Sequence, residues 1–148
     1  MPAIMRKMNV IARCGGQYRT AQLKNDELGS RHHSFVLAVC NHPGLSQDQL
    51  AHHLCLNKST VARALNFLEE KGYVTRTPGE SDRRVLLVNP TEKMQAVYPE
   101  VRRITGEWNE RLAEGIGEDE LALFFDVLGR METRAKELTG NADGGRNE

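Results

Sequence analysis

The 148-residue sequence has no long apolar run, and this absence limits the classes of protein that it can encode. The longest unbroken run is FVLAVC, from Phe35 to Cys40, whereas a helix needs about 20 apolar residues to cross a bilayer. The first ten residues, MPAIMRKMNV, also lack the apolar core of a signal peptide. We therefore expect a cytoplasmic protein that has no membrane partner.

The cysteines give no disulfide framework. There are three of them, an odd number: Cys14, Cys40 and Cys55. They lie far apart and form no CxxC motif. We expect free thiols in a reducing compartment, with Cys40 and Cys55 packed in apolar surroundings. The sequence also lacks a Gly-rich phosphate loop, a nucleophile motif and a paired-carboxylate site, so we predict neither an enzyme nor a bound cofactor.

The histidines do not predict a metal site. The adjacent pairs His32-His33 and His52-His53 point to different sides of a helix, so the two members of a pair cannot bind one ion. A zinc site would need Cys14 or acidic residues from elsewhere in the chain, and we predict no metal. We expect His52 and His53 to face solvent or phosphate.

Net charge is also absent, since 20 Lys and Arg balance 20 Asp and Glu, which excludes a polycation. The charges are nevertheless uneven along the chain. Residues 1–31 carry six basic against two acidic side chains, residues 57–88 six against four, and residues 106–148 five against eleven. This asymmetry indicates that one end of the molecule faces an anion and the other faces solvent or a partner. Solvated surfaces of uneven charge would give the same counts.

The first third of the sequence predicts two helices. Residues 5–28 have a loose apolar face, interrupted by Gly15-Gly16, and each glycine costs up to ~1 kcal/mol relative to alanine. We expect this helix to gain stability by packing against another element. Residues 31–42 predict a buried helix that is closed by Pro43-Gly44.

The next segment predicts a pair of capped helices. Ser46 and Gln49 form the S-x-x-Q capping arrangement at the start of the first helix. Asn57 is a suitable N-cap for the second helix, which runs to about Lys71 and stops at Gly72. Two helices separated by so short a turn are typical of a helix-turn-helix.

A β-hairpin and two further helices complete the prediction. Residues 73–75 and 85–88 are strand-like, and Pro78-Gly79 begins a turn-rich tip, so this hairpin forms a wing. A long helix starts near Thr91, where Pro99 should kink or break it, and a last helix follows Gly117. The fold class is mainly α with a small β-hairpin wing.

The second helix of the pair has two different faces. At 100° per residue, Val61, Ala64, Leu65 and Leu68 lie on one side and Ser59, Arg63 and Asn66 on the other. Arginine can bond guanine, asparagine can bond adenine, and serine or threonine can meet bases or phosphates. Glu69 and Glu70 would repel phosphate, so the C-terminal turns should lie away from DNA.

An arginine at a hairpin tip can enter the minor groove, and we expect Asp82 to orient such an arginine rather than to touch DNA. The candidate DNA-binding residues come from the second helix and the wing: Asn57, Lys58, Ser59, Thr60, Arg63, Asn66, Asp82, Arg83 and Arg84.

The arrangement resembles the MarR family of winged helix-turn-helix transcriptional regulators. The matching stretches are GLSQDQLAHHLCLNKSTVARALNFLEEKGYVTR, from Gly44 to Arg76, and SDRRVLLVNPTEKM, from Ser81 to Met94. The resemblance implies that the helix over 58–71 enters the major groove and that the D-x-R motif, Asp82 and Arg84, serves the minor groove. Met94 departs from the family pattern, which usually has glycine there, and we expect it to alter only local packing.

The resemblance also implies a homodimer. Residues 5–30 and 91–138 would be dimerisation helices, residues 31–90 the winged helix-turn-helix lobe, and residues 139–148 a disordered tail. The implied function is repression by binding a pseudo-palindromic site in double-stranded DNA, relieved by a small-molecule effector or an oxidant. The alternative is a winged helix that serves as a protein-interaction module without specific DNA binding, which the zero net charge and the acidic C-terminal third also fit.

Cys14 is the candidate redox sensor. CGGQYR, with Cys14 and Tyr18 four residues apart, is similar to the first helix of the organic-hydroperoxide-sensing branch of the family. That branch holds its thiolate with tyrosines from the partner's second helix, and the corresponding segment here has none. Arg31, His32 or His33 could lower the thiol pKa instead. The alternative for Cys14 is a small residue packed in a dimer helix.

Overall fold

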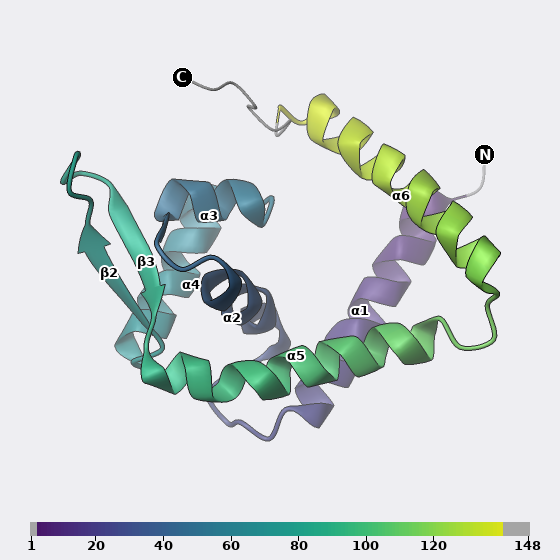
Figure 1. Cartoon of the computed structure of the whole chain (residues 1–148), viewed down its shortest axis with the longest axis horizontal. Coiled ribbons are helices and arrows are strands. Elements are labelled where there is room, and N and C mark those ends of the chain that lie inside the picture. The colour runs from purple at the N-terminus through teal and green to yellow at the C-terminus, as the bar shows by residue number, and fades with distance from the viewer. Residues whose placement is uncertain (1–2, 141–148) are drawn as a thin grey trace. The chain divides into compact units, whose positions relative to one another are not determined.

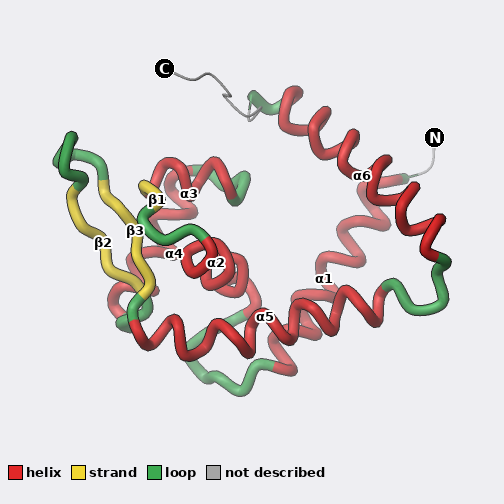
Figure 2. Tube along the Cα trace, viewed as in Figure 1, coloured by secondary structure: helices red, strands yellow, loops and turns green. Residues whose placement is uncertain are grey.

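Residues 3–140, which a computed structural model describes, form six helices and a three-stranded antiparallel sheet (Figures 1 and 2). In chain order the elements are α1 (Ile4–Gln22), α2 (Ser30–Asn41), β1 (Leu45–Ser46), α3 (Gln47–His53), α4 (Lys58–Glu70), β2 (Val74–Pro78), β3 (Leu86–Pro90), α5 (Glu92–Leu112) and α6 (Glu118–Leu138). The expected mainly helical fold with a hairpin wing is confirmed. The expected disordered tail lies, from residue 141 on, outside the described residues.

Helix α1 is shorter than the predicted helix over residues 5–28, because it ends at Gln22. The side-chain oxygen of Asn25 accepts hydrogen bonds from the backbone N–H groups of Glu27 and Leu28, at 2.8 and 3.1 Å. This asparagine turn competes with continuation of the helix. Leu28, the last residue of the predicted helix, is buried, but it lies in the loop that joins α1 to α2 rather than on a helix face.

The glycine pair does not interrupt α1, which runs through Gly15 and Gly16. Gly15 is the buried residue of α1, and a Cβ atom there would lie 3.1 Å from the ring of Trp108. The Trp108 ring also packs on Tyr18, with 5.4 Å between ring centroids. The missing side chain therefore admits a close contact with α5, which supplies the stabilising packing that the sequence predicted.

The hydrophobic core lies where α2, α3 and α4 pack beside the hairpin and the first half of α5 (Figure 1). Val61, Leu65 and Leu68 of α4 have no exposed surface, as the helical projection predicted. The other fully covered apolar side chains come from the neighbouring elements: Val36, Leu50, Met94, Val101 and Ile104. This core holds down one face of α4 and leaves the opposite face outside.

Both predicted helix caps are present. The Ser46 hydroxyl accepts from the backbone N–H of Gln49 at 3.0 Å, while the Gln49 side chain accepts from the N–H of Ser46 at 2.9 Å. The Asn57 side chain accepts from the N–H of Thr60 at 2.8 Å, and Gly72 ends α4 with a φ of +80°. These caps fix the start of each helix in the pair and the end of the second.

The wing is formed by β2 and β3, which pair from Val74 with Pro90 to Pro78 with Leu86. Strand β1, which the sequence reading missed, pairs with the other edge of β3, Leu45 with Val88. Two residues are too few to show a strand periodicity, so only the pairing with a distant strand reveals β1. It anchors the start of α3 to the base of the wing.

Helix α5 is not broken at Pro99. Met94 precedes the proline and Val101 and Ile104 follow it, and all three side chains are fully buried, so packing holds both halves in place. Of the described residues, those up to Asn109 form one compact unit, and those from Glu110 to Gly140 form a second. α6 belongs to the second unit and has no buried residue. Within residues 3–140, no helix is long and apolar enough to cross a membrane.

Candidate nucleic-acid interface

The outer face of α4 carries the residues that the sequence reading selected. Ser59, Arg63 and Asn66 are exposed, while Thr60 is half-buried. The Arg63 guanidinium lies 3.5 Å from the Thr60 hydroxyl, a contact that does not hold it firmly. The front of α4 thus presents a cation, a hydroxyl and an amide to solvent, opposite the face that is buried in the core.

The first turn of α4 is organised by Asn57. Its side-chain oxygen accepts from the Ser59 hydroxyl at 2.9 Å as well as from the Thr60 N–H. Lys58 pairs with Asp48 of α3 at 3.2 Å, and both side chains are more than two-thirds exposed. Such a surface pair is worth little and can exchange for a stronger anion.

Arg76 of β2 ties the middle of α4 to the sheet and was not among the predicted site residues. Its guanidinium donates to Asn66 Oδ1 at 2.7 Å, to both carboxylate oxygens of Glu69 at 2.9 and 3.2 Å, and to Gln47 Oε1 at 3.3 Å. These bonds hold the pKa of Glu69 below its ordinary value. Arg76 therefore compensates the Glu69 charge and fixes the Asn66 amide, whose NH₂ group is left as the outward donor.

A signal for Arg76 was present in the sequence. Strand residues alternate between faces, so Arg76 lies on the same side as the buried Val74, two positions earlier. Its side chain is only 15% exposed. A cation on the inner face of a strand that follows an acidic helix end predicts an ion pair, although periodicity does not name the partner.

The wing tip is built around Asp82. Its carboxylate accepts from the backbone N–H of Arg84 at 3.0 Å and from the Arg84 guanidinium at 3.2 and 3.4 Å, so hydrogen bonds from Arg84 lower the Asp82 pKa. The Arg84 side chain is nevertheless 92% exposed. Asp82 thus binds one edge of the Arg84 guanidinium while most of the side chain stays in solvent, which is the orienting contact that the sequence predicted. Arg83 beside it is also exposed.

Gly79 allows the tip to close. A Cβ atom at this position would lie 2.9 Å from the backbone oxygen of Asp82, a distance that real Cβ atoms do not adopt. The Gly79 N–H instead donates to the carbonyl of Val85 at 2.7 Å. Glycine is required here because the chain passes close to itself, and this contact places the two wing arginines.

The remaining cysteine and histidine predictions have mixed outcomes. Cys14 is exposed on α1, and Cys40 packs against the core, where burial raises its thiol pKa. Cys55 was predicted to be in the core and is exposed in the turn between α3 and α4, so that prediction is wrong. His52 and His53 are exposed, as expected. Among the described residues, no group of three or more His, Cys, Asp or Glu side chains could hold a metal ion.

His32 and His33 cannot act as the cations that the sequence suggested could lower the pKa of the Cys14 thiol. Burial, with a smaller contribution from Arg31, lowers the pKa of His32. The His32 ring stacks on Phe67 with 4.6 Å between centroids, and its Nδ1 accepts from the Gly29 N–H. Burial, followed by repulsion from Arg19 and His32, lowers the pKa of His33 to about 4. Both rings are therefore neutral near pH 7.

The burial of His33 makes stability depend on pH. Its ring is 1% exposed, and neither nitrogen has a hydrogen-bond partner among residues 3–140. The folded pKa of about 4 lies below the ordinary value of 6.5, so the unfolded chain binds the extra proton between these values and stability falls as pH falls. At pH 5 we expect this group to cost about 2 kcal/mol relative to pH 7.

Urea unfolding of the wild type and of His33→Leu at pH 7 and pH 5 measures this cost. Leucine is apolar, has a volume similar to that of histidine and cannot bind a proton. The variant should therefore lose less stability than the wild type on acidification. Equal losses in the two proteins would show that His33 does not carry this pH dependence.

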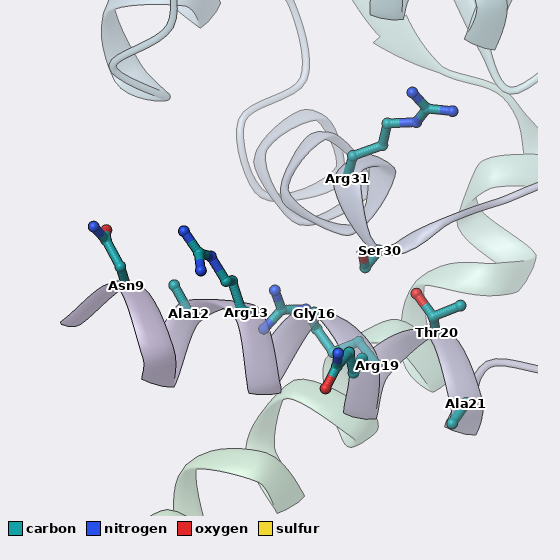
Figure 3. Close-up of a pocket in the computed structure, with 10 residues that line it drawn as sticks. Asn9, Ala12, Arg13, Gly16, Arg19, Thr20, Ala21, Ser30 and Arg31 are labelled. Atoms are coloured by element: carbon teal, nitrogen blue, oxygen red, sulfur yellow. The ribbon is translucent and has the colours of Figure 1, made fainter. Parts of the chain in front are cut away.

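A broad hollow lies between α1 and the start of α2 (Figure 3). Its volume is about 910 Å³, and its lining includes three arginines and two hydroxyls but no acidic side chain among the described lining residues: Arg13, Arg19, Arg31, Thr20 and Ser30. Arg13 and Asn9 project from α1 toward the side where α2 begins (Figure 3). The surface of the hollow therefore favours an anion.

A helix pair with a buried inner face, an exposed second helix and an arginine-tipped hairpin define a winged helix-turn-helix protein. Residues 32–86 match the family model described as MarR family. A transcriptional regulator of the helix-turn-helix type from Bacillus subtilis (strain 168), YybA, is 28% identical over 131 residues, which cover 88% of this chain and 87% of that protein. Over residues 32–86 the chain therefore matches the MarR family, and along most of its length it is similar to a transcriptional regulator of the helix-turn-helix type.

Solved structures of transcriptional regulators have closely similar folds. The transcriptional regulator SlyA matches with a TM-score of 0.87 and 29% identity, over 91% of this chain and 95% of that one. A MarR transcriptional regulator from Methanosarcina mazei Go1 matches with a TM-score of 0.82 and 27% identity, over 91% and 97%. A MarR-family protein from Listeria monocytogenes, solved with a 26mer DNA, shares the fold with a TM-score of 0.88 and 24% identity, over 100% and 99%.

Proposed function

We propose that the chain is a homodimeric, sequence-specific DNA-binding repressor that acts in the cytoplasm, where it meets the DNA that it binds. One observation carries this proposal: α4 and the wing tip, within one compact unit, both present exposed arginines, while Glu69 and Asp82 beside them are paired with Arg76 and Arg84. The structure of a protein with the same fold together with a 26mer DNA is consistent with it.

In the proposed complex, the first half of α4 lies in the major groove. The candidate contacts are Asn57, Lys58, Ser59, Thr60, Arg63 and Asn66, and of these Arg63 suits the acceptors of guanine. Asn57 caps the helix with its side-chain oxygen, so it would contribute its amide NH₂ group. The first N–H groups of a helix also favour a phosphate. Glu69 remains outside the groove, paired with Arg76.

The wing would enter the minor groove next to the major-groove segment that α4 of the same chain contacts. Arg84, with Arg83 beside it, carries the positive charge, and Asp82 limits the orientations that the Arg84 side chain can adopt. Narrow minor grooves concentrate negative potential and attract arginine. Together α4 and the wing would fix both the register and the orientation of the residue 31–90 lobe on the duplex.

The exposed apolar side chains of the terminal helices support a homodimer. In α6, Leu123, Phe125 and Leu138 are each more than 60% exposed, and in α1 Met5 and Val10 are at least half exposed. A soluble monomer rarely leaves so much apolar surface uncovered, and a second copy would cover it. We assign α1, α5 and α6 to this interface, and two copies of α4 would then read half-sites about 10–10.5 bp apart.

Gel-shift competition against genomic fragments at low salt tests this function. The proposal predicts a pseudo-palindromic fragment that is retained against an excess of random duplex, by a species whose mass in sedimentation is that of two chains. If the winged helix is instead a protein-interaction module, binding will be no tighter than to random duplex. Substitution of Arg63 or Arg84 would then leave its activity intact.

We also propose that an anionic effector relieves repression from the arginine-lined hollow. Trp108, the single tryptophan, packs against Gly15 and Tyr18 on α1 and can report binding through its fluorescence. Small aromatic and aliphatic carboxylates should change this fluorescence in the wild type but not in Arg13→Gln or Arg31→Gln. Arg102→Gln, an exposed arginine of α5, is the matched control. Unchanged binding in all three variants would contradict this site.

Cys14 remains the proposed sensor if the signal is an oxidant, because its thiol is exposed on α1. The wild type should then release the retained DNA fragment on treatment with an organic hydroperoxide, and Cys14→Ser should not. Equal release from the two proteins would exclude Cys14 as the sensor.

A further inference from the structure

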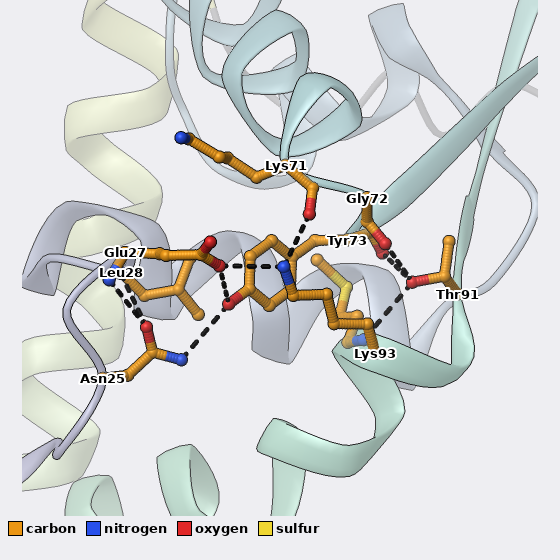
Figure 4. A network of polar contacts seen from close by, with 9 residues as sticks. Asn25, Glu27, Leu28, Lys71, Gly72, Tyr73, Thr91 and Lys93 are labelled. Carbon is orange, nitrogen blue, oxygen red and sulfur yellow. Dashed lines mark hydrogen bonds and ion pairs between the residues drawn. The ribbon is translucent and has the colours of Figure 1, made fainter.

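Three segments far apart in the sequence meet at the C-terminal end of α4 (Figure 4). They are the loop between α1 and α2, the turn between α4 and β2, and the start of α5. Their polar contacts centre on Glu27 of the loop, Tyr73 after α4 and Lys93 of α5. We call these three residues the α4 clamp.

Tyr73 is the centre of the clamp. Its side chain is 2% exposed, yet its hydroxyl is fully partnered, since it donates to Glu27 Oε2 at 2.8 Å and accepts from Asn25 Nδ2 at 3.2 Å. Both partners belong to the α1–α2 loop. The backbone N–H of Tyr73 donates to the carbonyl of Leu68 in α4. A buried residue adjoining the end of α4 is thus fixed by side chains from the loop.

Lys93 closes the clamp from the other side. Its ammonium group donates to Glu27 Oε2 at 2.9 Å and to the backbone oxygen of Lys71 at 2.8 Å, and it lies 4.5 Å from the centre of the Tyr73 ring. Lys71 is the C-cap residue of α4, whose carbonyl has no partner within the helix. A cation at this end of a helix is also favoured by the helix dipole.

Thr91 holds the next carbonyls of the same turn. Its hydroxyl lies 2.6 Å from the oxygen of Gly72 and 3.0 Å from that of Tyr73, and its backbone N–H donates to the Tyr73 oxygen at 3.0 Å. The carbonyl groups from Lys71 to Tyr73 are therefore all bound by Thr91, which precedes α5, and by Lys93 in the first turn of α5. The C-terminal end of α4 is set by two segments that lie outside the helix pair.

We propose that the α4 clamp positions the recognition helix for DNA, by fixing its C-terminal end to the α1–α2 loop and to α5. This inference rests on the proposed function, because it assigns α4 to the major groove. Helix α4 has 13 residues and is therefore about 20 Å long, so a tilt of about 5° at the clamped end displaces the reading end by nearly 2 Å. A displacement of that size breaks hydrogen bonds to base edges.

The clamp also gives a physical path from the arginine-lined hollow to the reading face. The hollow is lined by Thr20 and Ala21 of the last turn of α1 and by Ser30 and Arg31 at the start of α2. The loop that bears Asn25 and Glu27 joins these two segments directly. A ligand that moves either helix end must move this loop, and with it the partners of the Tyr73 hydroxyl.

Glu27→Gln tests the clamp, because positioning and simple electrostatics predict opposite signs. The substitution removes a negative charge, so electrostatics alone would strengthen binding to the DNA polyanion. Positioning predicts weaker binding to the retained fragment, by roughly fivefold within the two- to thirtyfold range of such coupling substitutions. Affinity for random duplex should not fall. Asp26→Asn is the matched control, since the neighbouring exposed residue loses the same charge.

Tyr73→Phe provides a second variant that keeps the buried ring and leaves the net charge unchanged. It should weaken specific binding to a similar extent, and the double variant Glu27→Gln, Tyr73→Phe should lose less than the product of the two single losses, because the residues share one contact. Thermal unfolding of each variant establishes that it is folded at the assay temperature. Amide hydrogen exchange at Tyr73 reports the clamp without DNA and should accelerate in Glu27→Gln.

The outcomes separate this inference from the proposed function. Weaker specific binding by folded Glu27→Gln, but not by Asp26→Asn, supports the clamp, and equal affinities of these two variants overturn it. If the wild type binds no fragment better than random duplex, the proposed function fails, and with it the positioning of α4 for DNA. Exchange at Tyr73 then decides whether the clamp holds the end of α4: acceleration supports this contact, and an unchanged rate excludes it.

Discussion

Arg63→Ala is expected to weaken binding to the cognate DNA by about 1–3 kcal/mol, or roughly 5- to 150-fold. Arg63 projects from the outer face of α4, where the weak contact with Thr60 leaves its donors available for guanine. The loss should also relax specificity at one base pair in each half-site, because the removed donors read a base edge. Fluorescence anisotropy with a labelled cognate duplex measures both effects.

Arg102→Ala is the matched control for this prediction. Arg102 is an exposed arginine of α5, and its substitution removes the same charge from a surface to which we assign no base contact. The control should change affinity for cognate and random duplex by the same small factor. A loss of affinity in Arg63→Ala that is equal for cognate and random duplex would mean that Arg63 contacts phosphate rather than a base.

Met94→Ala is expected to lower the free energy of unfolding by about 2–5 kcal/mol. The Met94 side chain is fully buried in the core, near the start of α5. Truncation removes apolar contacts and leaves a cavity that the flanking helices cannot fill completely. Met94→Gly, which restores the residue usual in the family pattern, should cost about 1 kcal/mol more, because glycine is unfavourable inside a helix.

Met94→Leu keeps the volume and should cost less than about 1.5 kcal/mol. Urea unfolding of the three variants, all measured at one protein concentration, gives the comparison. If the alanine variant were no less stable than the leucine variant, the core around Met94 would not depend on this side chain. Met94, which departs from the family pattern, would then contribute little to the stability of the core.

The parts of the fold that depend on neighbouring residues could be predicted from the sequence. The Ser46 and Asn57 caps use side chains that bond backbone groups three positions away, so a short stretch contains all the participants. The buried face of α4 follows from helical periodicity, and the Asp82–Arg84 contact spans only two residues. These local features were sufficient to place α4 and the wing.

The parts that depend on distant partners could not be predicted. β1 exists only because Leu45 and Ser46 pair with β3, more than forty residues away. Arg76 joins residues of α3 and α4, and the Glu27–Tyr73 contact links positions separated by 46 residues. Periodicity assigns a residue to a face but does not name the residue opposite. For the same reason the prediction that Cys55, which lies between Leu54 and Leu56, is in the core was wrong.

Dimethyl sulfate footprinting of the retained DNA fragment tests the central claim most directly, because the reagent reports guanine N7 in the major groove and adenine N3 in the minor groove. We predict two patches of major-groove protection about 10–10.5 bp apart, one for each α4 of the dimer. Minor-groove protection should lie beside each patch and disappear selectively in Arg84→Ala. Protection without two such patches, or identical footprints of the wild type and Arg84→Ala, would contradict the reading of DNA by α4 and the wing.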